Sequence, residues 1–393
     1  MQVPVTESRP TLFRNASLHV QRELQKEGWV LVEGGLVAKV GRGAPPSVPQ
    51  ARLIDVGGLI LAPGLIDLHV HGALGYDTMD ATRQALRQMA RFYAQHGVTA
   101  FLATTTSNPL ESLLAALKNV GDVMRTGAGG ATLLGAHVEG PYLNAERAGA
   151  QDPSHIRDPD ADEWRQILST GVVKVLTLAP ELPGSEELIR LAVAHGVTVS
   201  VGHTCASFET MCRAVDAGVT QVTHLFNGME PLHHRKPGAV GAALVLDSLR
   251  CQLIADNVHV DPAVLDLVVR CKGVDRVILI TDAMRAAGMP DGEYELGGLA
   301  VTVRRGVPRL ASGALAGSTL TLERAVRNMM AAANLSLPAA LSMATSVPAR
   351  ALGLGGRKGS IAAGKDADLI IVDEDMHVSL TMVGGDIVYR TEM

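Results

Sequence analysis

The sequence predicts an α/β protein, a (β/α)8 TIM-type barrel with a small β-sandwich domain built from both chain termini. Through the middle of the chain, amphipathic segments end at a Gly-Val pair and an apolar run follows, as at Gly97-Val98 and Gly196-Val197. Glycine tolerates the left-handed turn that ends a helix, and a β-branched apolar run is typical of a strand buried on both faces. At both ends of the chain, short alternating segments separated by turn residues predict antiparallel strands instead.

Eight apolar runs follow one another through the central region, and eight parallel strands close a barrel. They read LAPGLIDLHV, VTAFLATTT, ATLLGAHVE, VVKVLTLAP, VTVSVGHT, VTQVTHLF, CQLIADNVHV and VDRVILITD. An open, doubly wound sheet is the competing topology. The barrel is favoured because the count is eight and because no Gly-x-Gly-x-x-Gly follows the first strand. The expected boundaries are residues 58–354 for the barrel and residues 1–57 with 355–393 for the β-sandwich domain.

The composition excludes several classes of protein. A chain of 393 residues with 47% hydrophobic content can bury a large core. Its formal net charge of -5 argues against a nucleic-acid partner, which would need a basic face. The N-terminal stretch MQVPVTESRP has no signal pattern and no apolar run is long enough to span a bilayer, so we expect a cytoplasmic protein with no membrane partner. The four cysteines lack Cys-x-x-Cys spacing, which indicates reduced thiols and excludes a cysteine-based zinc knuckle.

The stretch Leu65 to His71 (LIDLHVH) ends an apparently buried strand in an acid and two imidazoles. His69 and His71 alternate along the strand, so they share a face and could close on one ion. Taken alone, such a pair is equally consistent with two packed, hydrogen-bonded histidines. In barrels of this type, however, the chemistry lies at the C-terminal ends of the strands. Four further candidate ligands end four other predicted strands: Glu139, His203, His224 and Asp282. Imidazole and carboxylate ligands together suit zinc, iron or another first-row divalent ion.

Longer motifs point to a family. In chain order, PGLIDLHVHG, HVEGPYL, GHT, THLFNGM, HHRKPG, IADNVHV, TDAM and LAGSTLTLERAVRNM resemble the N-acetylglucosamine-6-phosphate deacetylase family of the amidohydrolase superfamily. His-x-His alone marks only the superfamily, whereas HVEGP, THLFN and TDAM without a lysine at the end of the fourth strand are more specific. The resemblance covers nearly the whole chain. It implies a homodimer in which each subunit has a barrel and a β-sandwich domain built from both chain termini. It also implies that the protein acts on a phosphorylated N-acetyl amino sugar.

The resemblance also implies roles for the candidate ligands. Glu139, His203 and His224 match the family's principal metal site, and His69 with His71 match members that hold a second ion. We therefore expect one or two divalent ions per subunit, zinc first, with iron, manganese or cobalt as alternatives. Such an ion brings the pKa of a water to about 7. Asp282 is expected to take a proton from that water and to pass it to the leaving sugar nitrogen.

The substrate contacts follow from the same resemblance. Arg235 and His259 match the family's phosphate contacts. His233, His234 and Lys236 are candidate helpers, within the chain or across a dimer interface, and a solvated basic loop is the favoured interpretation of Lys236. The other expected substrate-binding positions are Ala150, Gln151, Asn227, Gly228, Leu315, Ala316 and Gly317. Gln151 departs from members that carry a histidine there, and we expect its amide to donate a hydrogen bond to the developing oxyanion while the metal polarises more of the carbonyl.

Three alternatives remain open. The substrate could be N-acetylgalactosamine-6-phosphate, which differs in the orientation of one hydroxyl. A cyclic-amide hydrolase of the same superfamily would carry a bridging lysine, and the fourth strand's end, LTLAPE, has none. A non-catalytic barrel relative would have lost metal ligands, whereas this chain keeps every candidate.

Overall fold

A computed structural model describes residues 9–20 and 23–391. The expectation that the chain starts without a signal pattern falls mainly on residues 1–8 and lies outside the described residues. At the centre is a parallel sheet whose eight strands pair in chain order from β6 to β15. They are β6 (Leu65–Val70), β9 (Val98–Thr104), β10 (Thr132–Glu139), β11 (Val173–Leu178), β12 (Thr198–Val201), β13 (Gln221–Val222), β14 (Arg250–Ile254) and β15 (Val277–Ile280).

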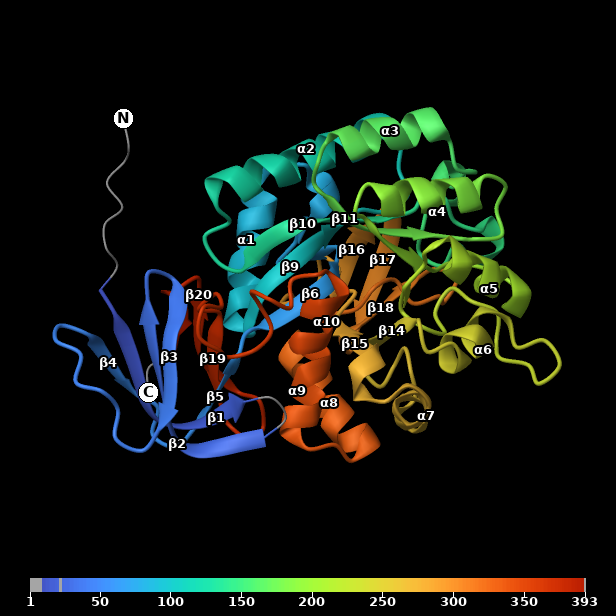
Figure 1. The fold of residues 1–393 in the computed structure, drawn as a ribbon. Coiled ribbons are helices and arrows are strands. Elements are labelled where there is room, and N and C mark those ends of the chain that lie inside the picture. The colour runs from blue at the N-terminus through green and yellow to red at the C-terminus, as the bar shows by residue number, and fades with distance from the viewer. Residues whose placement is uncertain (1–8, 21–22, 392–393) are drawn as a thin grey trace.

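The sheet closes on itself, which confirms the barrel over the open sheet. The first and last strands meet at their C-terminal ends, where the Asp282 amide donates to the His69 carbonyl at 2.9 Å. Helices surround the strands (Figure 1). They are α1 (Arg83–Gln95), α2 (Leu110–Thr126), α3 (Ala161–Ser169), α4 (Ser185–Ala194), α5 (Phe208–Ala217), α6 (Gly238–Val245), α7 (Pro262–Lys272), α8 (Leu322–Ala333), α9 (Leu337–Ala344) and α10 (Ser346–Ala351).

The glycines of the Gly-Val pairs end helices, as the sequence predicts. Gly97 and Gly196 each lie two positions after the last residue of α1 and α4, with φ of 76° and 73°. A residue with a side chain is strained in this left-handed conformation, whereas glycine is not. Each turn therefore ends its helix and returns the chain to the next barrel strand.

Strands from both ends of the chain form a second sheet beside the barrel (Figure 1), as predicted. It contains β1 (Thr11–Val20), β2 (Glu23–Glu33), β3 (Leu36–Arg42), β4 (Arg52–Asp55), β5 (Ile60–Pro63), β19 (Leu369–Val372), β20 (Val378–Val383) and β21 (Asp386–Arg390). Side chains from its N-terminal and C-terminal strands share one apolar core, among them Phe13, Leu61 and Leu380. The exact domain boundaries at residues 57/58 and 354/355 stay a prediction.

The run predicted as one first strand, LAPGLIDLHV, is divided between the two sheets. Its first part belongs to β5, which pairs with β1 and β19, and only β6 enters the barrel. Gly64 lies at the crossing, where a Cβ would come within 2.1 Å of the Thr99 side chain. The close approach of the two sheets therefore requires glycine at this point, and apolarity alone could not reveal the division.

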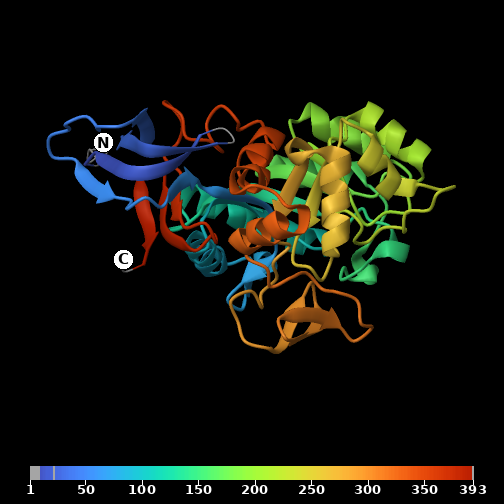
Figure 2. The same ribbon diagram turned by 90° about the horizontal axis from the view of Figure 1, so that it is seen from below.

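An antiparallel sheet that the sequence analysis does not predict is inserted between β15 and α8. It comprises β16 (Gly292–Leu296), β17 (Leu299–Arg304) and β18 (Val307–Leu310). In Figure 2 these strands stand apart from the barrel, near the small hairpin of β7 (Gly72–Ala73) and β8 (Tyr76–Asp77). The stretch EYELGGLAVTVRRGVPRL carries the signal, since alternating residues are interrupted by Gly-Gly and Arg-Arg-Gly turns.

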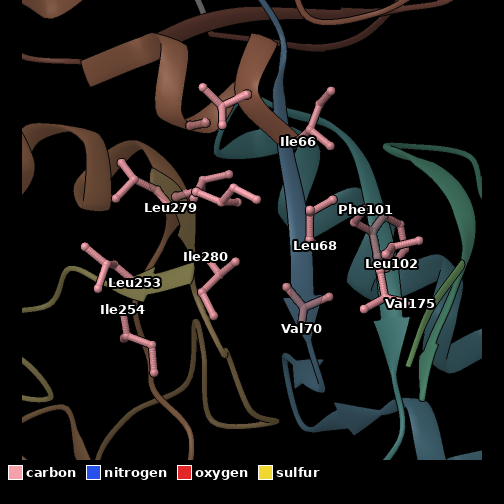
Figure 3. Packing of buried hydrophobic residues seen from close by; sticks show 14 of the residues in the cluster. Ile66, Leu68, Val70, Phe101, Leu102, Val175, Leu253, Ile254, Leu279 and Ile280 are labelled. Carbon is pink, nitrogen blue, oxygen red and sulfur yellow. The ribbon is translucent and has the colours of Figure 1, made fainter. Parts of the chain in front are cut away.

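Apolar side chains fill the space between the strands and the helices. Figure 3 shows part of this core, including Ile66, Leu68 and Val70 of β6 beside residues of β9, β14 and β15. The alternate positions of β6 carry Asp67 and His69, both buried. Because neighbouring residues on a strand face opposite ways, the polar side chains of β6 point into the barrel.

All four cysteines are free thiols. Among the residues that the model describes, no helix has both the length and the apolarity to cross a membrane.

Candidate metal centre and active site

The ends of five barrel strands bring the six predicted ligand residues together. All are buried, and the largest exposed fraction among them is 8%, at Asp282. The Nε2 atoms of His69 and His71 lie 3.1 Å apart. The Nε2 atoms of His203 and His224 lie 3.1 Å apart as well. Two imidazole pairs therefore converge at the same end of the barrel, as the sequence predicts.

Glu139, the last residue of β10, lies between the two pairs. Its Oε1 is 3.0 Å from Nε2 of His224 and 3.4 Å from that of His203. Its Oε2 is 3.3 Å from Nε2 of His71 and 3.5 Å from that of His69. Each carboxylate oxygen thus faces one imidazole pair. The result is two three-ligand groups that share Glu139.

Asp282 joins the group on the His69 side. Its Oδ1 lies 3.1 Å from Nε2 of His71 and 3.3 Å from Nε2 of His69. The backbone at Asp282, His203 and His224 is left-handed, with φ of 51°, 49° and 29°. Non-glycine residues seldom adopt this region, and such strain clusters at functional sites because the surrounding structure imposes it.

The charges in the centre shift the pKa values of its members. Burial raises the pKa of Asp282, but the neighbouring His69 and His71 outweigh burial and lower it to about 2. Burial lowers the pKa of His71, whereas its bonds to Asp282 and Glu139 raise that pKa to about 10. Burial likewise raises the pKa of Glu139, yet the three histidines hold it well below its usual range. The carboxylates are therefore ionised at neutral pH and the metal-free centre keeps protons on imidazole.

The donor set fits a divalent first-row ion. Nitrogen and carboxylate donors converge in two groups of three, and their ligand atoms lie within 4.8 Å of one another. The Nδ1 of His203 bonds the Arg147 carbonyl at 2.8 Å. That bond commits Nδ1 as a donor, so Nε2, which faces Glu139, is the nitrogen that can bind an ion; proteins orient imidazole ligands in this way. An ion here would replace the protons now held between the imidazoles and carboxylates.

A cavity of about 220 Å³ opens directly onto the centre. Its wall contains most of the predicted substrate-binding residues: Ala150, Gln151, Asn227, Gly228, His259, Leu315 and Gly317. Ala316 does not line it, because its side chain is buried in the apolar core under the inserted sheet. Arg235 lies outside the cavity of its own chain, where it is exposed and donates to Nε2 of His234 at 2.7 Å.

Gln151 makes two contacts that the sequence analysis does not predict. Its Nε2 donates to Glu139 Oε2 at 2.8 Å, and its Oε1 accepts from the Ser107 amide at 2.6 Å. One amide hydrogen therefore bonds the shared carboxylate, and the bond from the second hydrogen to an oxyanion stays a prediction. This bond holds Oε2 toward the His69 and His71 side of the centre.

Changing Gln151 to leucine should weaken metal binding and lower kcat together, each by about 10- to 100-fold, as expected for the loss of a bond to a ligating carboxylate. The substitution also leaves the buried Ser107 amide without its acceptor. Gln166 to leucine, on the exposed face of α3, is the matched control. Unchanged Zn²⁺ affinity by equilibrium titration, combined with a lower kcat, would instead favour the oxyanion role.

Several residues of the site were not predicted. Leu296 and Ala314 line the cavity from the inserted sheet and the loop that follows it. Glu181, just after β11, accepts from the Thr204 hydroxyl at 2.5 Å and the Cys205 amide at 2.6 Å, so it fixes the loop that carries His203. Its signal was available, since Glu181 also follows a barrel strand at the catalytic end.

A model of the amidohydrolase family matches residues 60–388. The chain belongs to the amidohydrolase family. The match confirms the superfamily that the sequence motifs predicted.

Individual relatives of this amidohydrolase agree with the resemblance. The N-acetylglucosamine-6-phosphate deacetylase of Vibrio furnissii is 43% identical over 343 residues, which cover 86% of each chain. The N-acetylgalactosamine-6-phosphate deacetylase of Escherichia coli O157:H7 is 39% identical over 94% of this chain and 98% of its own. Among solved structures, a mutant N-acetyl-D-glucosamine-6-phosphate deacetylase from Mycobacterium smegmatis, in complex with N-acetyl-D-glucosamine-6-phosphate, superposes with a TM-score of 0.91 at 36% identity, over 97% of this chain and all of that one.

Proposed function

We propose that this amidohydrolase removes the acetyl group of N-acetylglucosamine-6-phosphate, giving glucosamine-6-phosphate and acetate. The observation that carries the proposal is the shared carboxylate, Glu139, between two imidazole pairs at the base of a cavity. An intact set of ligands also argues against a non-catalytic relative. Similarity to deacetylases of phosphorylated amino sugars supports the choice of substrate class.

We assign Glu139, His203 and His224 to one divalent ion and His69, His71 and Glu139 to a second, with zinc as the first choice and iron, manganese or cobalt as alternatives. A bound ion supplies Lewis-acid polarisation of the acetyl carbonyl and acidifies a water. Asp282 acts as the general base at Oδ1, since its low pKa keeps it ionised. It takes a proton from the water as the oxygen bonds to the acetyl carbon, and it delivers that proton to the nitrogen as the C–N bond breaks, so that acetate and a neutral amine leave.

The cavity wall is suited to hold the sugar and its phosphate. Gly317, at φ of 60°, has no side chain between its backbone and the cavity. His259 donates from Nδ1 to Asp256 Oδ2 at 2.7 Å, which leaves its Nε2 for the ligand. Burial raises the pKa of Asp256, but the bonds from His259 lower it overall, so the carboxylate stays charged and orients the ring.

Arg235 leads to the proposal of a homodimer. Its guanidinium is exposed and lies outside the cavity of its own chain. We propose that two subunits pair so that Arg235 of one reaches the phosphate in the other. Arginine suits this role because its planar fork binds phosphate through two parallel hydrogen bonds.

Arg235 to alanine should raise KM for the phosphorylated sugar by about 10- to 100-fold with little change in kcat, because a hydrogen bond to a charged group contributes about 1.5 to 3 kcal/mol. Arg190 to alanine, an exposed arginine on α4, is the control. Mixing Arg235→Ala subunits with Asp282→Asn subunits tests the arrangement directly. Restored activity supports an arginine supplied by the neighbour, and no restoration contradicts it.

The galacto epimer is the second candidate substrate, and the 39% identical relative named for N-acetylgalactosamine-6-phosphate favours keeping it. Parallel kcat/KM measurements on the two phosphorylated epimers decide between them.

We also propose that the enzyme acts in the cytoplasm, since its thiols are unpaired and thiols persist in reducing compartments.

Removal of metal tests the proposal as a whole. A chelator should abolish deacetylation, and Zn²⁺, Mn²⁺, Co²⁺ or Fe²⁺ should restore it. The ion should also stabilise the fold, by about 2.7 kcal/mol when the free ion is at 100 times its Kd. Full activity in protein shown by elemental analysis to be free of metal would refute the assignment.

A further inference from the structure

We propose that Asp67 is a positioning residue, which together with Thr281 fixes Asp282 opposite His69 and His71. The inference rests on the proposed function. Asp67 does not line the cavity and is 1% exposed, so it does not meet substrate. Its place is the seam where β6 and β15, the first and last barrel strands, close the barrel.

All the close contacts of Asp67 lead to the centre. Its Oδ2 accepts from the Thr281 hydroxyl at 2.7 Å. Its Oδ1 accepts from the amides of His69 at 3.2 Å and Thr281 at 3.4 Å. One carboxylate therefore holds the backbone of a predicted metal ligand and the residue that precedes the predicted general base.

The other side of Asp282 is held by the loop after the inserted sheet. Ser318 donates from its hydroxyl to the Thr281 carbonyl at 2.5 Å and from its amide to the Asp282 carbonyl at 2.8 Å. The Asp282 amide in turn donates to the His69 carbonyl at 2.9 Å. Asp282 is thus tethered from both directions while its backbone remains at φ of 51°, a conformation that would relax if one tether were lost.

A carboxylate is well suited to this position. The site offers two amide donors and one hydroxyl donor, and no donor is needed from the side chain itself. A charge is costly to bury, and burial raises the pKa of Asp67 to about 7, although the bonds from Thr281 and His69 offset part of that cost. An asparagine has the same shape, but its amide nitrogen is a donor. It would face either the Thr281 hydroxyl or the amides of His69 and Thr281, all of which donate to Asp67.

The test compares Asp67→Asn, Thr281→Val and the double variant with Thr281→Ser, which keeps the hydroxyl. We expect each of the first two to lower kcat by about 10- to 100-fold with KM within about 2-fold, as for other groups that support a ligand or catalytic residue. The double variant should be no worse than the poorer single one, because the two residues act as a unit. Thr281→Ser should stay within about 3-fold of wild type.

A second readout does not depend on the substrate. Equilibrium titration of metal-free protein with Zn²⁺ should show weaker binding of at least one ion in Asp67→Asn and Thr281→Val, and wild-type binding in Thr281→Ser. If wild type binds Zn²⁺ but cleaves no sugar, the proposed function fails while the titration still tests the positioning. Unchanged kcat and Zn²⁺ binding in Thr281→Val, or additive effects in the double variant, would overturn the inference. Should Asp67→Asn not fold, the valine and serine variants at Thr281 decide.

Discussion

Glu139 to glutamine is expected to lower kcat/KM by at least about 10³-fold and to reduce bound metal to less than one ion per subunit. Both three-ligand groups share this carboxylate, so one substitution weakens both. The ion contributes several kcal/mol of transition-state stabilisation, and each 1.36 kcal/mol is a factor of ten in rate. The variant keeps the shape of the side chain, so the loss reports the charge of the ligand.

Glu187 to glutamine is the matched control, since it removes an exposed carboxylate on α4 and should leave both quantities unchanged. Activity and metal content are measured on the same preparations of all three proteins. A Glu139 variant that retains two ions and wild-type kcat/KM would contradict the shared-ligand arrangement.

Asp282 to asparagine should lower kcat by about 10²- to 10⁴-fold, the range that general acid-base catalysis contributes, with KM and total bound metal nearly unchanged. Asparagine has the size of aspartate but cannot take the proton from water or return it to the nitrogen. Asp282 stands beside His69 and His71, so the metal content separates its two conceivable roles. If the variant lost one bound ion as well as kcat, Asp282 would be mainly a metal ligand and not a general base.

The eight barrel strands could be predicted because most are apolar runs bounded by glycine and helix, and because local pattern decides such elements. The inserted sheet could also have been found, since its hairpin turns are visible in the sequence. The division of the first run at Gly64 could not, because both halves are equally apolar. What separates β5 from β6 is which sheet supplies the hydrogen bonds, and that is a tertiary property.

The ligands of the centre were predictable for a related reason. A polar residue at the end of an apolar strand is conspicuous, and the barrel brings all such ends to one place. Gln151 and Asp67 show the limit of this reasoning. The bond from Gln151 to Glu139 joins the loop after β10 to the last residue of that strand, and the bonds that Asp67 accepts from Thr281 join residues 214 positions apart. The separation of these residues along the chain gives no indication, in a single sequence, that their side chains are in contact. Arg235 was recognisable by its motif, but its position outside its own cavity depends on the fold.

Amine release from N-acetylglucosamine-6-phosphate is the most direct measurement, with unphosphorylated N-acetylglucosamine and the galacto epimer beside it and metal content determined on the same preparation. We predict a strong preference for a phosphorylated sugar, gluco over galacto, at one or two ions per subunit. If metal is bound and none of the three sugars is cleaved, the metal centre stands and the proposed deacetylase function is wrong.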